Sequence, residues 1–244
     1  MNINERHSIV GLPCVEHKVS KKPREIFLLR GNGCKWRKCR FCDYHLDFSS
    51  DEKENFELNS DVLENLTGEF GCIEIINSGS FSDLDEKTMA LIKAKCLEKS
   101  IKQIHFECHW NDRKNIEQLK KDFKKIGVTV KIKMGVETFD LVFRESYLLK
   151  GIDESSPEAI AKYADEVCLL QGIPGQTSTS MFTDIEIGLK YFERVCINVM
   201  CENSTPIKPD SRVISIFQKL VYPTYINNPR VDILIKNTDF GVGD

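Results

Sequence analysis

Short apolar runs alternate with amphipathic segments along the chain from residue 25 to about residue 201. The apolar runs predict strands at 25–31, 72–79, 101–110, 128–138, 166–175 and 195–201. Polar and apolar residues at helical spacing predict helices between them, at 59–70, 82–100, 111–127, 139–151, 155–164 and 180–194. Strands that are apolar throughout and separated by helices are typical of a parallel sheet. We therefore expect an α/β fold of about six β–α units.

Local signals mark several helix boundaries. The clearest helix is 111–127, because its apolar residues fall on one face and Gly127 is suited to end it. Ser82 is the expected N-cap of the helix over 82–100. Ser156, followed by Pro157 at the first helical position, is expected to begin another helix.

The pattern becomes less regular after about residue 205, where four prolines and one strand-like run, 231–236, remain. No linker, low-complexity segment or repeat divides the sequence. We expect a single domain over 1–244, with a core of about 25–205 and a short C-terminal extension of about 206–244. Parallel sheets bind ligands at the carboxyl ends of their strands, so functional residues are expected there.

Composition narrows the class of protein. Of 244 residues, 41% are hydrophobic and 29% charged, which is enough for a sizeable core and a polar surface. The net charge of −3 gives no overall attraction to nucleic acid or to an anionic membrane. The sequence has no apolar run of transmembrane length and its N-terminus lacks the apolar region of a signal peptide. We expect a cytoplasmic protein.

The chain has ten cysteines, and disulfides are disfavoured in a reducing compartment. Small buried hydrophobic roles are expected for Cys72, Cys96, Cys108, Cys168, Cys196 and Cys201. Cys34, Cys39 and Cys42 differ, because they lie in the polar loop "GCKWRKCRFCDYH" (33–45) after the first strand. The Lys and Arg residues of this loop would stabilise thiolates. The loop is therefore a candidate metal site.

Three metal centres compete for this loop. Zinc would take the three cysteines with His45, although these ligands are crowded into twelve residues. A [2Fe–2S] cluster would take the C-x4-C-x2-C spacing with Cys72 as a distant fourth ligand, although Cys72 opens an apolar strand. A [4Fe–4S] cluster held by only three cysteines would leave one iron open for an exchangeable ligand.

Four motifs in order resemble those of the radical S-adenosylmethionine (SAM) superfamily. They are the cysteine loop, "NSGS" (77–80), "GVET" (135–138) and "LLQGIPGQT" (169–177), each at or just beyond a predicted strand end. The resemblance covers roughly residues 25–205. It implies a partial (β/α)6 barrel, a [4Fe–4S] cluster and SAM as cofactors. The loop departs from the usual C-x3-C-x2-C pattern by one extra residue.

The resemblance also implies roles for single residues. The cluster ligands would be Cys34, Cys39 and Cys42. SAM-binding residues would be Phe41, Ser78, Gly79, Ser80, Glu137, Arg144 and Ile173. Among these, Gly79 and its serine neighbours would receive the SAM amino group, Glu137 the ribose hydroxyls and Arg144 the carboxylate, while the backbone at Ile173 would pack on adenine. Ser78 and Ser80 replace commoner residues of the motif.

The chemistry implied is hydrogen-atom abstraction by a 5′-deoxyadenosyl radical, with flavodoxin or ferredoxin as electron donor. Only some forty residues follow the core, which favours a small-molecule substrate over nucleic acid. Among short members the chain most resembles the queuine lyases, carbon–nitrogen lyases that release 7-aminomethyl-7-deazaguanine from queuine. Candidate substrate-binding residues at the expected mouth are His45, His105, Glu107, His109, Asn198, Glu202, Asn203 and Asp239. Alternatives are another radical SAM enzyme, for example a tRNA-modifying one, and a non-enzymatic iron–sulfur or zinc protein.

Overall fold

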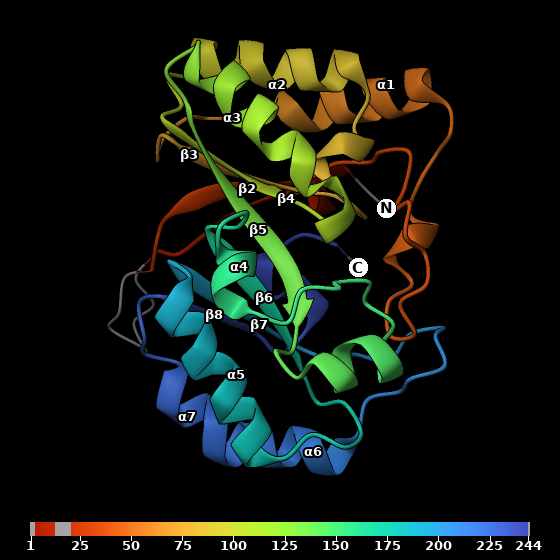
Figure 1. The fold of residues 1–244 in the computed structure, drawn as a ribbon. Coiled ribbons are helices and arrows are strands. Elements are labelled where there is room, and N and C mark those ends of the chain that lie inside the picture. Colours follow the sequence, from red (N-terminus) through yellow and green to blue (C-terminus); the bar gives the residue numbers. More distant parts are fainter. Residues whose placement is uncertain (1–2, 13–20, 244) are drawn as a thin grey trace.

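A computed structural model describes residues 3–12 and 21–243. Its centre is a curled sheet in which eight strands pair in sequence order. The strands are β1 His7–Val10, β2 Arg24–Leu28, β3 Cys72–Ile76, β4 Gln103–Glu107, β5 Thr129–Glu137, β6 Glu166–Gln171, β7 Arg194–Val199 and β8 Val231–Leu234. β1 is antiparallel to β2, and every other pair is parallel. The expected parallel half-barrel is confirmed (Figure 1).

Helices cover the outer face of the sheet in two groups (Figure 1). Their bounds are α1 Glu52–Leu63, α2 Glu86–Glu98, α3 Ile116–Lys124, α4 Pro157–Ala161, α5 Ser178–Tyr191, α6 Ser211–Ile216 and α7 Tyr222–Tyr225. Two π-helical turns, Phe143–Tyr147 and Phe217–Val221, and short 3-10 turns at Ile3–Glu5, Tyr44–Leu46, Phe81–Asp83, Trp110–Asn115 and Asn237–Phe240 complete the elements. The main apolar core lies between this helical layer and the sheet. Among the described residues, no helix is both long and apolar enough to cross a membrane.

Some helix boundaries differ from the predictions, because local capping decides them. The first helix, α1, begins where the Asp51 carboxylate accepts hydrogen bonds from two backbone N–H groups, and it ends before the expected 59–70 segment is complete. Asp85, rather than Ser82, caps α2. The prediction at Ser156 is confirmed, since its hydroxyl accepts from Ala159 N.

Three further differences from the predictions concern whole elements. β1 was missed, because four residues are too short to show a period. In the region after 205, α6, a π turn and α7 run on from one another, which the pattern did not predict, whereas the predicted strand-like run at 231–236 is confirmed as β8, which pairs with β7. The predicted helix over 139–151 is largely replaced by the π turn Phe143–Tyr147.

The interior of the half-barrel contains a charged layer, made of Arg24, Glu74, Lys133 and Asp232. Arg24 donates to Glu74 and, at 3.3 Å, to Asp232, while Lys133 also donates to Glu74. All four residues are buried. Because they come from β2, β3, β5 and β8, these ion pairs connect strands across the interior.

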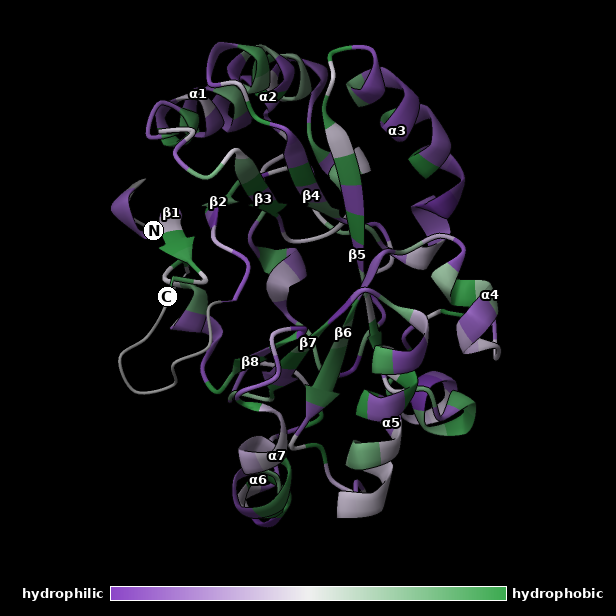
Figure 2. Cartoon of the chain, turned by 90° about the vertical axis from the view of Figure 1, so that its left-hand side faces the viewer, coloured by the Kyte–Doolittle hydropathy of each residue, from purple (hydrophilic) through white to green (hydrophobic). Residues whose placement is uncertain are grey.

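The C-terminal segment lies against the N-terminal strand. Ser8 Oγ donates to the carbonyl of Phe240, and Gly243 N donates to Glu5 O at 2.8 Å. Figure 2 shows the two termini side by side next to β1. The C-terminal segment thus connects the end of the chain to β1. β1 and β8 are the two edge strands of the sheet.

Candidate active site

The cysteine loop follows the carboxyl end of β2 and is anchored by segments far away in sequence. Trp36 Nε1 donates to Leu149 O at 2.8 Å, and Arg40 N donates to Leu148 O at 3.0 Å. On the other side, Asn203 Nδ2 donates to the Phe41 carbonyl at 2.7 Å. The loop is therefore fixed from both sides by backbone and side-chain hydrogen bonds.

The three predicted cluster ligands lie on one loop at this edge, and Cys39 interacts electrostatically with both Cys34 and Cys42. Cys39 and Cys42 pack against an apolar group that includes Ile173 and Met200. Burial raises the thiol pKa of Cys39 to about 11 and that of Cys42 to about 12, and the thiols interact electrostatically. In residues 3–12 and 21–243, no three His, Cys, Asp or Glu side chains converge as a formed metal-binding group. The donor set still fits an iron–sulfur cluster, since soft thiolates are the ligands such clusters take.

The two alternative ligand sets fare differently. Cys72 is buried at the amino end of β3, where it lies near Lys22 and Arg24. The cysteine loop follows the carboxyl end of β2, so Cys72 lies at the opposite end of a parallel pair and does not complete the site. His45, the last residue of the loop, lies on the 3-10 turn Tyr44–Leu46 and is partly exposed. The structure therefore disfavours the four-cysteine arrangement.

The "NSGS" segment contacts the cysteine loop directly. A Cβ on Gly79 would lie 2.9 Å from Cys34 Cα, so only glycine allows this approach. The flanking serines are already occupied: Ser78 Oγ donates to Asp47 O at 2.6 Å, and Ser80 Oγ accepts from His109 N at 2.7 Å. The serine hydroxyls thus shape the segment, and its backbone remains the part suited to a ligand.

Glu137 ends β5 in an uncommon conformation, with φ of 69° after a register shift in the strand pairing. A non-glycine residue in the left-handed region stores strain, which is often found at functional sites. Its carboxylate accepts from Lys150 Nζ at 2.6 Å, and both side chains are nearly buried. Lys150 is also next to Cys39 and Cys42. The Glu137 carboxylate raises the pKa of Lys150, and the sulfurs of the two cysteines raise it further.

Arg144 is placed differently from the prediction. Its side chain is fully buried, and its guanidinium donates to the carbonyls of Thr138, Ile152 and Glu154. Glu145 accepts a further hydrogen bond from it at 3.0 Å. These contacts fix the loop after β5 and disfavour the predicted pairing of Arg144 with a SAM carboxylate.

His109 supports the same region. Its Nε2 lies 3.1 Å from Lys150 O, and its Nδ1 accepts from Asn111 N, so the proton belongs on Nε2. Burial and the nearby Lys150 ammonium lower the pKa of His109 to about 4. The imidazole is therefore neutral and positions the segment that carries Lys150.

The "GIPG" turn after β6 is held by one side chain. Gln176 Oε1 accepts from Ile173 N at 2.9 Å, and its Nε2 donates to Leu170 O at 2.8 Å. Ile173 is fully buried beside Phe41 in the apolar group behind the cysteine loop. Two of the predicted SAM-binding residues, Phe41 and Ile173, are thus brought together.

Glu107 points into the half-barrel from the end of β4, in register with Lys133. Burial raises the pKa of its carboxyl to about 7, offset in part by Lys133 and the Asn77 N–H. Tyr44, on the 3-10 turn at the end of the cysteine loop, interacts electrostatically with both Glu107 and Cys42. Glu107 therefore lies between the charged layer and the cysteine loop.

The other predicted substrate residues lie in two regions, on strands β4 and β7 and in the loops after β7 and β8. His105 is buried deeper, where its ring contacts Glu166 and Gln103, and Asn198 lies on β7 near Cys196. Glu202 is largely exposed beside Lys208. Asn203 anchors the cysteine loop, as described above. Asp239 Oδ2 accepts from two backbone N–H groups of its own turn, which makes it a capping residue.

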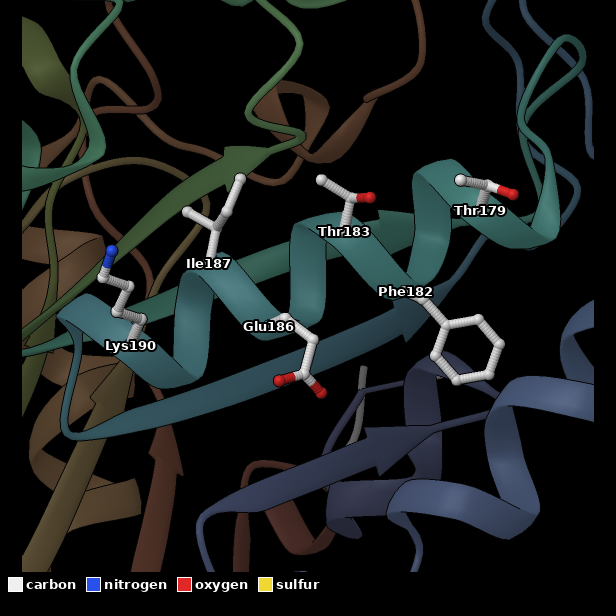
Figure 3. A pocket seen from close by; sticks show the side chains of 6 residues that line it. All are labelled: Thr179, Phe182, Thr183, Glu186, Ile187 and Lys190. Atoms are coloured by element: carbon white, nitrogen blue, oxygen red, sulfur yellow. The ribbon is translucent and has the colours of Figure 1, made fainter.

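Two surface hollows lie outside this region. One runs along the outer side of α5 and is lined by Thr179, Phe182, Thr183, Glu186, Ile187 and Lys190 (Figure 3). The other lies between the π turn after β5 and the "GIPG" turn, and includes Phe143, Tyr147 and Pro174. Neither contains the cysteines or Glu137.

Sequence reasoning missed Lys150, Tyr44 and Phe240. The aromatic ring of Phe240 lies over two cations of the charged layer, 5.3 Å from Arg24 Cζ and 5.4 Å from Lys133 Nζ. A lysine before a glycine at a helix end has an ordinary explanation as a C-terminal charge, so Lys150 gave no separate signal. The other two lie in segments without a periodic pattern.

A parallel half-barrel with a three-cysteine loop after its first parallel strand, and a strained carboxylate at the end of β5, is the arrangement of a radical SAM enzyme. Among solved structures, the chain is similar to queuine lyase from Clostridium spiroforme bound to SAM and queuine. The two are 40% identical with a TM-score of 0.90, over 98% of this chain and 99% of that one. The chain belongs to the queuine lyase family. No protein-family model and no curated protein matches it.

Proposed function

We propose that this chain is a radical SAM lyase that cleaves the carbon–nitrogen bond of queuine between the cyclopentenediol and the aminomethyl group, releasing 7-aminomethyl-7-deazaguanine (preQ1). The observation that carries the proposal is the full-length likeness to a queuine lyase that holds SAM and queuine. The convergence of the cysteine loop, Glu137 and Glu107 at one edge of the half-barrel supports it. We propose one radical SAM domain over the whole chain.

Cys34, Cys39 and Cys42 are the proposed ligands of a [4Fe–4S] cluster. A [4Fe–4S] cluster that takes only these three thiolates would leave one iron open for SAM. When bound, the cluster and SAM supply the 5′-deoxyadenosyl radical that takes a hydrogen atom from queuine. The chain's own part is to bind, orient and exclude water. The apolar group around Cys39 and Cys42 supports this, because it keeps solvent from the thiols.

The proposed SAM site uses residues from four strand ends. Glu137 accepts from the ribose hydroxyls, and the backbone at Gly79 receives the amino group. Phe41 and Ile173 pack on the adenine side. For the SAM carboxylate we propose Lys150, since its ammonium lies beside Cys39 and Cys42 while the Arg144 donors are taken by carbonyls.

The electron donor proposed for the cluster is a flavodoxin or a ferredoxin. We also propose a cytoplasmic location, where a reducing compartment keeps thiols free for a cluster. In support, the nine cysteines in the described part of the chain are all free.

The proposal is tested with protein reconstituted anaerobically with iron and sulfide. About four iron and four sulfide per chain are expected, which zinc or a [2Fe–2S] cluster would not give. Reduction in the presence of SAM and queuine should then yield 5′-deoxyadenosine and preQ1 together. If 5′-deoxyadenosine forms while queuine, queuosine and tRNA are unchanged, the enzyme class stands and the substrate is wrong. If 5′-deoxyadenosine forms neither with any of these substrates nor with SAM alone, the proposal of a radical SAM enzyme fails.

A further inference from the structure

Two side chains face the interior of the half-barrel between the charged layer and the cysteine loop. Glu107 does so from β4 because Phe106, next to it, packs outward against Phe123 on α3. Phe240 does so from the C-terminal segment, since its ring lies over Arg24 and Lys133 and packs against the inward-facing group of Cys168, Cys196 and Leu234. The two residues lie 133 positions apart in sequence, so the fold alone brings them to the same layer.

The Glu107 carboxylate has no ion-pair partner of its own among the described residues. Lys133 is its register neighbour, but the lysine ammonium donates to Glu74. Glu107 is partly exposed within the barrel, unlike Glu74, which is buried. A hydrogen bond from the Asn77 N–H leaves further acceptor positions on the carboxylate. This group can therefore accept hydrogen bonds from a ligand without breaking an ion pair.

Phe240 supplies a flat apolar surface at the same depth. Its ring covers Arg24 and Lys133 and packs beside Cys168 and Cys196, yet it stays partly exposed. The segment that carries it is fixed, since the Phe240 carbonyl accepts from Ser8 Oγ and Asp239 caps the turn. A ring held in this way loses little freedom when a planar molecule stacks on it.

These features match a purine-like base that carries adjacent N–H donors. Such a base needs a carboxylate for its N1–H and 2-amino edge, and an aromatic partner for its ring. Other predicted candidates fit less well, because Asp239 is occupied as a cap and Glu202 lies exposed at the rim. We propose that Glu107 and Phe240 recognise the 7-deazaguanine base, Glu107 through the N1–H and 2-amino edge and Phe240 by stacking. This inference rests on the proposed function.

The test measures binding without turnover, with reconstituted enzyme, SAM and no reductant. The probes are preQ1, queuine and the analogue of preQ1 that lacks the 2-amino group. Wild-type enzyme should bind the analogue at least 10-fold more weakly than preQ1, because Glu107 then has no donor there. In Glu107→Gln this difference should largely disappear, since the amide's acceptor oxygen and its N–H group no longer match two donors. Dissociation constants for SAM should stay within 2-fold.

Phe240→Ala should weaken binding of both preQ1 and its analogue by about 10- to 100-fold, as base stacking on an aromatic ring is lost. Phe240→Tyr keeps the ring and should bind nearly as wild type. Thr238→Ala, an exposed change in the same turn, is the matched control. It should leave the dissociation constants for preQ1, queuine and the analogue unchanged. Equal losses in Phe240→Ala and Thr238→Ala would mean a general effect on the tail and would overturn the role of the ring.

The inference and the proposed function fail in different ways. If wild type converts queuine but Glu107→Gln still discriminates against the analogue, or Phe240→Ala binds normally, only the assignment of the base site is wrong. If wild type binds SAM and forms 5′-deoxyadenosine but binds neither preQ1 nor queuine, the substrate itself is wrong, and the base site falls with it.

Discussion

Lys150 Nζ lies 2.6 Å from Glu137 Oε1 at the carboxyl end of β5, next to the thiols of Cys39 and Cys42. Neither side chain is more than 12% exposed. The pair places one cation between a proposed ribose acceptor and the proposed cluster ligands. The contact therefore links the proposed ribose side of the SAM site to the side of the cluster ligands.

We expect Lys150→Met to weaken SAM binding by at least 10-fold and to destabilise the fold by about 3–5 kcal/mol, because Glu137 is left as a buried, unpaired carboxylate. Adding Glu137→Gln should restore much of the stability without restoring SAM affinity. Urea unfolding and equilibrium dialysis with SAM measure the two effects. Lys121→Met removes an exposed pair with Glu117 and should change stability by less than about 0.5 kcal/mol. Normal SAM affinity in Lys150→Met would exclude the lysine from the carboxylate site.

Gly79→Ala should prevent correct assembly of the cysteine loop, since the new Cβ would lie 2.9 Å from the Cα of Cys34. We expect iron per chain after reconstitution to fall by more than half. Gly127→Ala is a suitable control: its φ of 77° costs about 1 kcal/mol, but nothing lies within 4 Å of its Cβ. That variant should lose stability and keep its iron. A full iron content in Gly79→Ala would mean that the two segments separate freely.

The cysteine assignment predicts a clear difference between two kinds of alanine variant. Cys34→Ala, Cys39→Ala and Cys42→Ala should each abolish the visible absorption of the reconstituted cluster. Cys96→Ala, in the buried face of α2, should keep the absorption and lose about 1 kcal/mol of stability. Anaerobic spectroscopy with iron analysis is the measurement. A cluster that survives Cys39→Ala would contradict the three-ligand assignment.

The parts of the site that could be predicted are those encoded within one segment. Apolar runs marked the strands, and the spacing of Cys34, Cys39 and Cys42 marked the loop. The Lys150–Glu137 contact spans 13 residues and depends on the π turn between them, which no helical period indicates. Phe240 meets Ser8 across 232 residues, so its place in the barrel follows only from closure of the whole sheet.

His109 should make stability depend on pH below neutrality. Its pKa is lowered to about 4 in the fold, against about 6.5 when unfolded, so the unfolded chain binds a proton first as pH falls. The contribution of His109 to the free energy of unfolding is therefore unchanged above pH 7 and decreases between about pH 6.5 and 4. At pH 5 the loss should be about 1–2 kcal/mol, measured as the difference between wild type and His109→Gln in urea. Parallel pH curves for the two proteins would show that His109 is not held neutral.

Arg24 should be needed for both stability and the base site. It donates to Glu74 and Asp232 and lies under the Phe240 ring, so its loss removes a cation that pairs with two buried carboxylates. We expect Arg24→Met to cost about 3–5 kcal/mol in urea unfolding.

The same change should separate the two ligands of the site. Without Arg24 the ring of Phe240 loses a cation beneath it, and β2 loses the hydrogen bond from Arg24 to Asp232 on β8. The contacts of the cysteine loop and of Glu137 do not involve Arg24 and are kept. Binding of preQ1 should therefore weaken at least 10-fold while SAM affinity changes little. Arg212→Met, an exposed change on α6, is the control and should alter neither. Equal weakening of preQ1 and SAM binding by Arg24→Met would show that the charged layer supports the whole barrel and not the base site in particular.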